Sequence, residues 1–151
     1  MLHMSDLPIT YRGTVYPWHC DHMGHMNVMW YVGKFDEATW QPLFLIGASR
    51  DRLAADGCGM AALEQHIDYE CELRAGDVIT IRSEIIELRN KVVRFRHVMT
   101  NDGTGEVSAT TTLVGVHFDL AARKAKPLPD DIREKALAHM RQSTRTDAAI
   151  V

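Results

Sequence analysis

The chain has 151 residues, of which 46% are hydrophobic and 25% are charged, and its formal net charge is −3. This length and composition are typical of one globular domain with a substantial core. The negative balance excludes the basic surface that nucleic acid or an anionic membrane requires, and no apolar run is long enough to span a bilayer. We therefore expect neither nucleic-acid nor membrane partners.

The cysteines and the N-terminus indicate the compartment. Cys20, Cys58 and Cys71 are odd in number and form no paired motif, so free thiols in a reducing cytoplasm are the simplest interpretation. The first ten residues lack the basic and apolar segments of a signal peptide. We expect a cytoplasmic protein with a single domain over residues 1–141 and a flexible polar tail over 142–151.

The first two elements are a strand and a long helix. β-branched and aromatic residues over 9–16 predict the strand, which Pro17 ends. After a polar loop, the pattern becomes helical from Met29 to Leu45. The clearly polar residues of this helix share one narrow stripe: Lys34, Glu37 and Gln41. So thin a stripe predicts a helix buried on most sides, and Pro42 predicts a kink or a break near its end.

The rest of the chain predicts strands joined by hairpins. Polar and apolar residues alternate from Leu63 to Leu73, which indicates a strand with one solvated face. Three further strands follow with the turns between them: 79–88, Arg89-Asn90-Lys91, 93–99, Asn101-Asp102-Gly103 and 106–118. A phase shift at Ile85–Ile86 predicts a β-bulge, and a last helix is expected to begin near Asp130.

The elements follow the order strand, long helix, four strands and short C-terminal helix. This order predicts an α+β fold in which a five-stranded antiparallel sheet wraps around the central helix. The outer face and the edges of such a sheet need cover, so we expect a homodimer or a homotetramer.

The densest group of functional residues lies in the loop before the long helix, Trp18-His19-Cys20-Asp21-His22-Met23-Gly24-His25-Met26-Asn27. Asp21 is the one carboxylate of this loop. Gly24 allows a tight turn or a close approach to a ligand, and Asn27 is a favourable helix N-cap. The loop therefore predicts a point where a carboxylate meets the free N–H groups of a helix start.

This loop and the order of elements resemble the hot-dog fold thioesterases, in particular the branch related to 4-hydroxybenzoyl-CoA thioesterase. The resemblance covers about residues 9–120 and rests on these motifs: Asp21 to Asn27, Tyr31, Phe35-Asp36-Glu37-Ala38, Tyr69, Gly76-Asp77 and Asn101-Asp102-Gly103. At His19 the sequence departs from relatives, which have an acidic residue there. The resemblance implies a hot-dog fold, an active site formed in a dimer, and hydrolysis of acyl-CoA, but it does not fix the substrate. We expect a small or medium acyl-CoA thioester and no cofactor.

The chemistry of a thioester fits this loop. Its carbonyl is electrophilic and its thiolate leaves readily, so the reaction needs a carboxylate and an oxyanion site. The resemblance implies that Asp21 attacks the carbonyl or activates water. Backbone N–H groups around Asn27, Val28 and Met29 would stabilise the oxyanion, aided by the helix dipole. His25 either orients Asp21 or the substrate, or it only satisfies the loop backbone, and Asn27 holds the donors by capping the helix.

Two sets of residues are candidates for substrate binding. Aromatic rings along the helix would line the acyl pocket beside Gly24: Trp30, Tyr31 and Phe35. Basic residues around one hairpin would hold the phosphates of CoA: Arg89, Lys91, Arg94 and Arg96. Both sets have a structural alternative, because such aromatics are usually core and basic turns are usually solvated surface. His66 and Asp68 either reach a neighbouring subunit's site or face solvent.

Three rival hypotheses stay open. Glu37 is a second carboxylate, but it lies roughly 13 Å along the helix axis from Val28, so we expect it to be structural. A metal site is the second, because ligands gather at His19, Cys20, Asp21, His22 and His25. The loop lacks a His-Glu-x-x-His pattern, so we expect no metal. A hot-dog dimer that binds acyl-CoA without cleaving it is the third.

Overall fold

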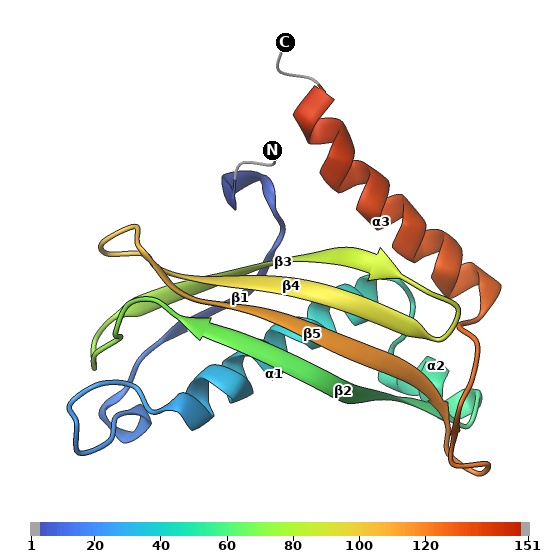
Figure 1. Ribbon diagram of the computed structural model, residues 1–151, viewed down its shortest axis with the longest axis horizontal. Helices are drawn as coiled ribbons and strands as arrows, with labels where there is room; N and C mark the ends of the chain where they lie inside the picture. The colour runs from blue at the N-terminus through green and yellow to red at the C-terminus, as the bar shows by residue number, and fades with distance from the viewer. Residues whose placement is uncertain (1–3, 149–151) are drawn as a thin grey trace.

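The structure is a computed structural model that describes residues 4–148, and the side chains of residues 4–142. Its elements are η1 Met4–Asp6, β1 Ile9–Thr14, η2 Pro17–His19, α1 Val28–Leu45, α2 Arg50–Ala55, β2 Cys58–Tyr69, β3 Val78–Leu88, β4 Val92–Asn101, β5 Val107–Asp119, β6 Lys124–Ala125 and α3 Asp130–Ala148. Figure 1 shows α1 lying along one face of a curved sheet. None of the described helices is long and apolar enough to cross a membrane.

The strands form one antiparallel sheet in the order β1-β3-β4-β5-β2, and the two-residue β6 pairs with β5. The predicted α+β architecture of five strands around a helix is therefore confirmed, with β6 as a short addition. The register of β3 against β4 shifts between Ile85 and Glu87, which confirms the predicted bulge. β1 and β2 are the two edges of the sheet.

Helix α1 begins one residue before its predicted start. Asn27 is its N-cap, in extended conformation, and the Asn27 side chain accepts a hydrogen bond from the Met29 N–H. The buried face of the helix packs on the sheet in a core cluster that includes these residues: Tyr31, Phe35, Ala38, Ile79, Ile81 and Met99. Burial of these apolar side chains fixes α1 across the sheet and thereby fixes the position of its N-terminus.

Helix α1 differs from its expected burial and has no break. Lys34, assigned to the polar stripe, is only 5% exposed, whereas Val32, Trp40 and Phe44 are exposed. In the single chain, the helix is therefore buried only on the side that faces the sheet. The helix also continues through Pro42 to Leu45 without a break, so Pro42 costs it one backbone hydrogen bond and does not end it; a kink at Pro42 stays a prediction.

The predicted strand from Leu63 to Leu73 is displaced toward the N-terminus. β2 spans Cys58–Tyr69, and a register shift between Ala62 and Glu64 leaves Leu63 64% exposed. Leu73 is buried although it lies beyond the strand. Its carbonyl accepts a hydrogen bond from the Met26 N–H at 2.7 Å, so the segment after β2 is held against the start of α1.

The C-terminal helix is longer than predicted. α3 begins at Asp130 as expected, and its buried Ile132 and Ala136 pack in a second core cluster with Leu43 of α1. It continues to Ala148, so the backbone of residues 142–148 is helical, and the flexibility of the tail stays a prediction; residues 149–151 lie outside the described part of the chain. Each Ser, Thr or Asp in a helix costs only a fraction of a kcal/mol of helix stability relative to Ala. A helix that is already formed can therefore continue through them.

Candidate active site

The loop between β1 and α1 makes a tight turn that starts at Asp21. The Gly24 N–H donates to the Asp21 carbonyl at 3.0 Å, and the Asp21 N–H donates to the His25 carbonyl at 3.2 Å. Gly24 has a φ of +84°, a conformation that glycine adopts without steric cost. Cys20 and Met26 then pair as an isolated bridge, which closes the loop directly in front of α1.

The Asp21 carboxylate is held from two sides. Its Oδ2 accepts a hydrogen bond from Asn27 Nδ2 at 2.8 Å, and its Oδ1 accepts one from the Met23 N–H at 2.8 Å. The Asn27 hydrogen bond, followed by that of Met23, lowers the pKa of Asp21 because both favour the charged form. The carboxylate is therefore ionised at neutral pH, as a nucleophile or a general base must be.

Asn27 connects this carboxylate to the helix. Its Oδ1 accepts the Met29 N–H at 3.0 Å while its Nδ2 donates to Asp21. The backbone N–H of Asn27 donates to the His19 carbonyl at 2.9 Å. The predicted cap thus has a second task, because one amide side chain fixes Asp21 relative to the helix start.

Only one of the three proposed oxyanion donors is free. The Asn27 and Met29 N–H groups donate within the loop and the cap, and the Trp30 N–H donates to the Asn27 carbonyl at 3.0 Å. Within residues 4–148, the N–H of Val28, the first residue of α1, donates to no acceptor. A free N–H at a helix N-terminus, where the helix dipole is positive, suits a developing negative charge.

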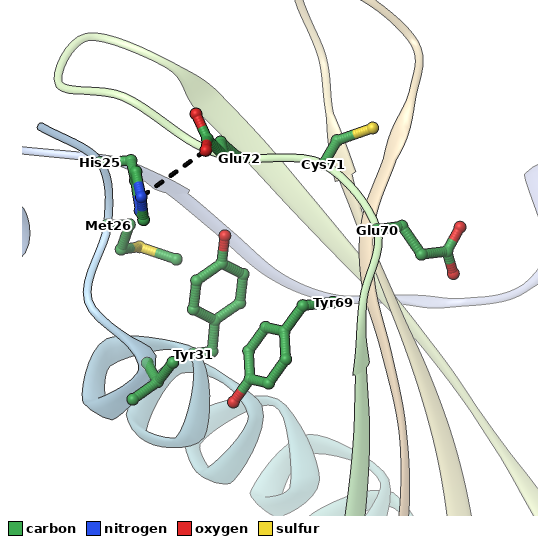
Figure 2. Close-up of a pocket in the computed structure, with 8 residues that line it drawn as sticks. His25, Met26, Tyr31, Tyr69, Glu70, Cys71 and Glu72 are labelled. Carbon is green, nitrogen blue, oxygen red and sulfur yellow. Dashed lines mark ion pairs between the residues drawn. The ribbon is translucent and has the colours of Figure 1, made fainter. Parts of the chain in front are cut away.

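Val28 lines a pocket of about 220 Å³ beside the helix start, called the Val28 pocket below. The other lining residues come from the loop, from α1 and from the end of β2: His25, Met26, Tyr31, Tyr69, Glu70, Cys71 and Glu72 (Figure 2). The contact between Leu73 and Met26 brings these two distant segments together.

Two tyrosines and a glutamate form the inner wall of the Val28 pocket. The rings of Tyr31 and Tyr69 are perpendicular, with an angle of 89° and centroids 5.1 Å apart. Burial, together with the nearby Tyr69 and Glu72, raises the pKa of Tyr31 to about 12, so its phenol is neutral. Figure 2 shows the Tyr31 hydroxyl pointing toward His25 and Glu72, while the Glu70 carboxylate points away.

His25 faces the pocket rather than the carboxylate. Its Nε2 lies 3.6 Å from Glu72 Oε1, and no hydrogen bond among the described residues joins its imidazole to Asp21. Its backbone carbonyl is what contacts the Asp21 N–H. The geometry is thus suited to contact between His25 and a bound substrate, not to direct orientation of Asp21.

The other aromatic candidates lie outside the Val28 pocket. Phe35 is fully buried in the core. Trp30 lines a second pocket, on the side of α1 that faces β1. Of the three aromatic residues proposed for the acyl pocket, the structure brings only Tyr31 to the free N–H of Val28.

The basic hairpin is also remote. Arg89 and Arg94 both pair with Glu87, at 2.6 and 3.0 Å, and Lys91 is exposed at the turn. Figure 1 shows this β3–β4 turn at the opposite end of the sheet from the start of α1. Within one protomer the proposed phosphate-binding residues therefore do not adjoin Asp21.

The loop histidines point in different directions. His19 Nδ1 accepts the Tyr16 N–H at 2.9 Å, His25 faces Glu72, and His22 is exposed. In the described part of the chain, no group of three or more His, Cys, Asp or Glu side chains is placed to hold a metal ion. The metal hypothesis therefore has no preformed site to support it.

The remaining candidates lie elsewhere on the surface. Glu37 is exposed and lines the pocket that contains Trp30. His66 and Asp68 form an exposed pair on β2, with Nε2 and Oδ1 3.2 Å apart. Neither Glu37 nor this pair lines the Val28 pocket.

Glu72 and Tyr69 line the Val28 pocket, whereas the sequence indicates no site for Glu72 and gives Tyr69 only as part of a shared motif. Both were placed on one continuous strand, whereas β2 ends at Tyr69 and the chain then turns toward α1. The contact between Leu73 and Met26 holds these residues at the start of α1. The alternation of polar and apolar residues along the sequence carries no information about that contact.

Comparison with known proteins places these features in context. The sequence pattern of the thioesterase-like superfamily matches residues 15–136. A betainyl-CoA thioesterase of Pseudomonas aeruginosa is 26% identical over 137 residues, which cover 89% of this chain and 86% of the relative. A long-chain acyl-CoA thioesterase of Escherichia coli is 28% identical over 118 residues, which cover 78% of this chain and 89% of the relative.

Solved structures share the architecture. A hypothetical protein from Staphylococcus aureus, solved in complex with CoA, superposes with a TM-score of 0.84 at 20% identity and covers 89% of this chain and 85% of its own. A probable thioesterase from Escherichia coli gives 0.74 at 26% identity, over 88% of this chain and 98% of its own. These similarities confirm the predicted hot-dog fold.

Proposed function

The chain belongs to the thioesterase-like superfamily and is a thioester hydrolase, and on this premise we propose that it cleaves a small or medium acyl-CoA thioester whose acyl group lies in the Val28 pocket. Asp21 does not line this pocket itself; it belongs to the loop that contributes His25 and Met26 to the lining. One observation carries the proposal. The Asn27 side chain holds the ionised Asp21 at 2.8 Å and caps the helix whose first N–H, that of Val28, is free in the described structure. A carboxylate and an oxyanion donor are thus fixed by a single residue.

The Val28 N–H would bind the thioester carbonyl oxygen. As the carbonyl carbon becomes tetrahedral, this oxygen gains negative charge, and a fixed donor at a helix N-terminus stabilises that charge more than it stabilises the neutral substrate. Mutation of one such donor typically lowers kcat by about 100- to 1,000-fold. The N–H of Val28 is therefore expected to contribute most of its effect in the transition state.

Asp21 would supply the carboxylate in one of two ways. As a nucleophile, its oxygen bonds to the acyl carbon, the C–S bond breaks, CoA leaves as thiolate, and water then cleaves the anhydride. As a general base, it takes a proton from the water that attacks the carbonyl, the C–S bond breaks, and the proton passes to the thiolate. Both routes start from the ionised form, which the hydrogen bond from Asn27 favours.

For the acyl group we propose a small cation, with betainyl-CoA, the substrate named for the Pseudomonas relative, as the first candidate. The faces of Tyr31 and Tyr69 attract a quaternary ammonium, and the carboxylate of Glu72 lies on the same wall. Arg74 also approaches Glu72, at 3.8 Å, but both side chains are exposed, so that pair is weak. A long-chain acyl group, as named for the Escherichia coli relative, is the competing candidate.

Release of free thiol from a panel of acyl-CoA thioesters tests both the proposed hydrolysis and the proposed cationic acyl group. The matched pair is betainyl-CoA and 3,3-dimethylbutanoyl-CoA, which has the same shape without the charge. After correction for their rates of hydroxide hydrolysis, we expect kcat/KM to favour betainyl-CoA by about 10-fold, since such cation–π contacts contribute about 0.5–2 kcal/mol. Glu72→Gln should reduce this ratio.

The panel separates the two claims. Preference for a long neutral chain would contradict the cationic acyl group and leave the activity intact. Failure to cleave any thioester, with CoA still bound, would instead favour the hypothesis of a binding protein without catalysis.

We further propose that the active form is a homodimer joined at β2. The outer edge of β2 is unpaired in the single chain, and an exposed strand edge is a ready surface for a second copy. Exposed apolar side chains lie on β2 and on α1: Val32, Trp40, Phe44 and Leu63. Light scattering of the purified protein should give twice the chain mass, or four times for the predicted tetramer, and an active monomer would refute the proposal.

The role of the basic hairpin depends on this assembly. Because the β3–β4 turn lies at the opposite end of the sheet from the start of α1, a second protomer would have to supply the hairpin that binds the CoA phosphates. Lys91→Glu would then raise KM for the CoA thioester without lowering kcat.

The cytoplasmic location stays a prediction that cell fractionation tests. Cys20, Cys58 and Cys71 are free thiols in the structure.

A further inference from the structure

Lys34 is a buried charge without an ion partner. Its side chain is 5% exposed, and its Nζ donates to the Tyr11 hydroxyl at 3.0 Å and lies 5.2 Å from the centre of the Tyr11 ring. Among the described residues, no carboxylate forms an ion pair with it. An ammonium has three N–H donors, so the protein leaves two of them for something else.

The ammonium lines an open pocket of about 490 Å³ between α1 and β1, called the Lys34 pocket below. The Lys34 pocket shares no lining residue with the Val28 pocket. Its rim carries Tyr16 and Trp18, whose rings stack with centroids 4.4 Å apart and an angle of 7°. Trp18 is 66% exposed, so this stacked pair is not explained by core packing.

His19 adds a second donor to the Lys34 pocket. Because its Nδ1 accepts the Tyr16 N–H, the neutral ring carries its hydrogen on Nε2. Burial, and then the charge of Lys34, lower the pKa of His19, which keeps the ring neutral at physiological pH. Nε2–H has no acceptor in the part of the chain described here, and the Trp30 ring contacts His19 at 4.6 Å between centroids.

We propose that the Lys34 pocket binds an aromatic carboxylate. Lys34 and His19 both line the pocket, so their two donors are available to the two oxygens of a carboxylate, and a charge-assisted hydrogen bond to a buried ammonium is the strong kind. The rings of Tyr16 and Trp18 offer a flat surface on which the ligand's own ring stacks. This site is independent of the proposed hydrolysis, because it shares no lining residue with the Val28 pocket.

Glu37 lines the same pocket, and its substitution tests the sign of the charge on the ligand. Its negative charge opposes the binding of an anion, whereas that of Lys34 favours it. The two substitutions Lys34→Met and Glu37→Gln should therefore change the affinity for an anion in opposite directions. If the pocket selects cations instead, Lys34→Met should strengthen the binding of a cationic ligand and Glu37→Gln should weaken it.

The experiment is a titration of the full chain with benzoate, followed by tryptophan fluorescence and by calorimetry. Trp40→Phe removes the tryptophan that lies outside the pocket, since the chain has three. We expect benzoate to bind at least 10-fold more tightly than neutral benzamide. Lys34→Met should weaken benzoate binding at least 10-fold, Trp18→Ala should weaken it several-fold, and Glu37→Gln should strengthen it.

Four results would overturn the proposal, and the first three concern ligand affinity and Glu37→Gln. They are equal affinity for benzoate and benzamide, binding that Glu37→Gln weakens, and inorganic phosphate that binds more tightly than benzoate. Lys34→Met without effect would also refute it. If that variant does not fold, Glu37→Gln, Trp18→Ala and the comparison of benzoate with benzylammonium on the unmodified chain still decide the question.

Discussion

Replacement of Val28 by proline removes the proposed oxyanion donor and little else. Proline has no N–H, and it is favoured at the first position of a helix, where Val28 lies. The residue before a proline must be extended, and Asn27 already has φ −70° and ψ 147°. The Val28 side chain is 57% exposed, so its loss leaves no cavity.

The expected size of the effect follows from these facts. Stability should change by less than about 1 kcal/mol, because no hydrogen bond of the described structure uses this N–H and the new residue suits the position. Loss of the donor should lower kcat by about 100- to 1,000-fold, which corresponds to roughly 3–4 kcal/mol of transition-state stabilisation. Val28→Ala, which keeps the N–H and shortens the side chain, is the matched control.

The assay compares thiol release by the two variants on the best acyl-CoA substrate, with urea denaturation as the check of folding. We expect Val28→Ala to retain most of the activity and Val28→Pro to lose it. A folded Val28→Pro variant with a kcat within threefold of Val28→Ala would refute the assignment of the oxyanion donor.

Two further predictions concern Asn27 and the buried His97. Asn27→Ser keeps a good helix cap but loses the hydrogen bond to Asp21. We therefore expect kcat to fall at least 10-fold while the urea midpoint stays near that of wild type. A fall in both kcat and the urea midpoint would mean that Asn27 acts only as the helix cap. His97 is fully buried against Ser83 and Thr39, and burial lowers its pKa from 6.5 to about 4. The unfolded chain therefore takes up a proton at higher pH than the native one, so stability is complete above pH 6.5 and is lost as the pH falls toward 4, by about 2 kcal/mol between pH 7 and 5. Urea unfolding at both pH values measures this loss, and a His97→Gln variant with the same slope would show that other groups cause it.

Local patterns in the sequence predicted the features that depend on local contacts. Asn27 as a cap, Gly24 in a tight turn and the bulge near Ile85 are each fixed by a few neighbouring residues. The sequence predicts backbone donors around Asn27, Val28 and Met29, with the Val28 N–H as the proposed catalytic group. The backbone hydrogen bonds of the loop and cap single out Val28.

Two features of the pockets depend on particular long-range contacts and were not predicted. The Val28 pocket needs the segment after β2, which one hydrogen bond between Met26 and Leu73 brings to the helix start. Lys34 has the spacing of a surface residue, yet the Tyr11 hydroxyl from β1 receives its ammonium inside the protein. In both cases the partner is distant in the sequence, so periodicity carries no information about it.

The most direct test of the account is the turnover of Asp21→Asn on the best acyl-CoA substrate. Asparagine keeps the size of the side chain and a hydrogen-bond acceptor for the Met23 N–H, but it can be neither the nucleophile nor the general base. We expect a folded variant that still binds the substrate and whose kcat falls at least 100-fold. Near-wild-type turnover by a folded Asp21→Asn variant would contradict the central claim that this carboxylate performs the hydrolysis.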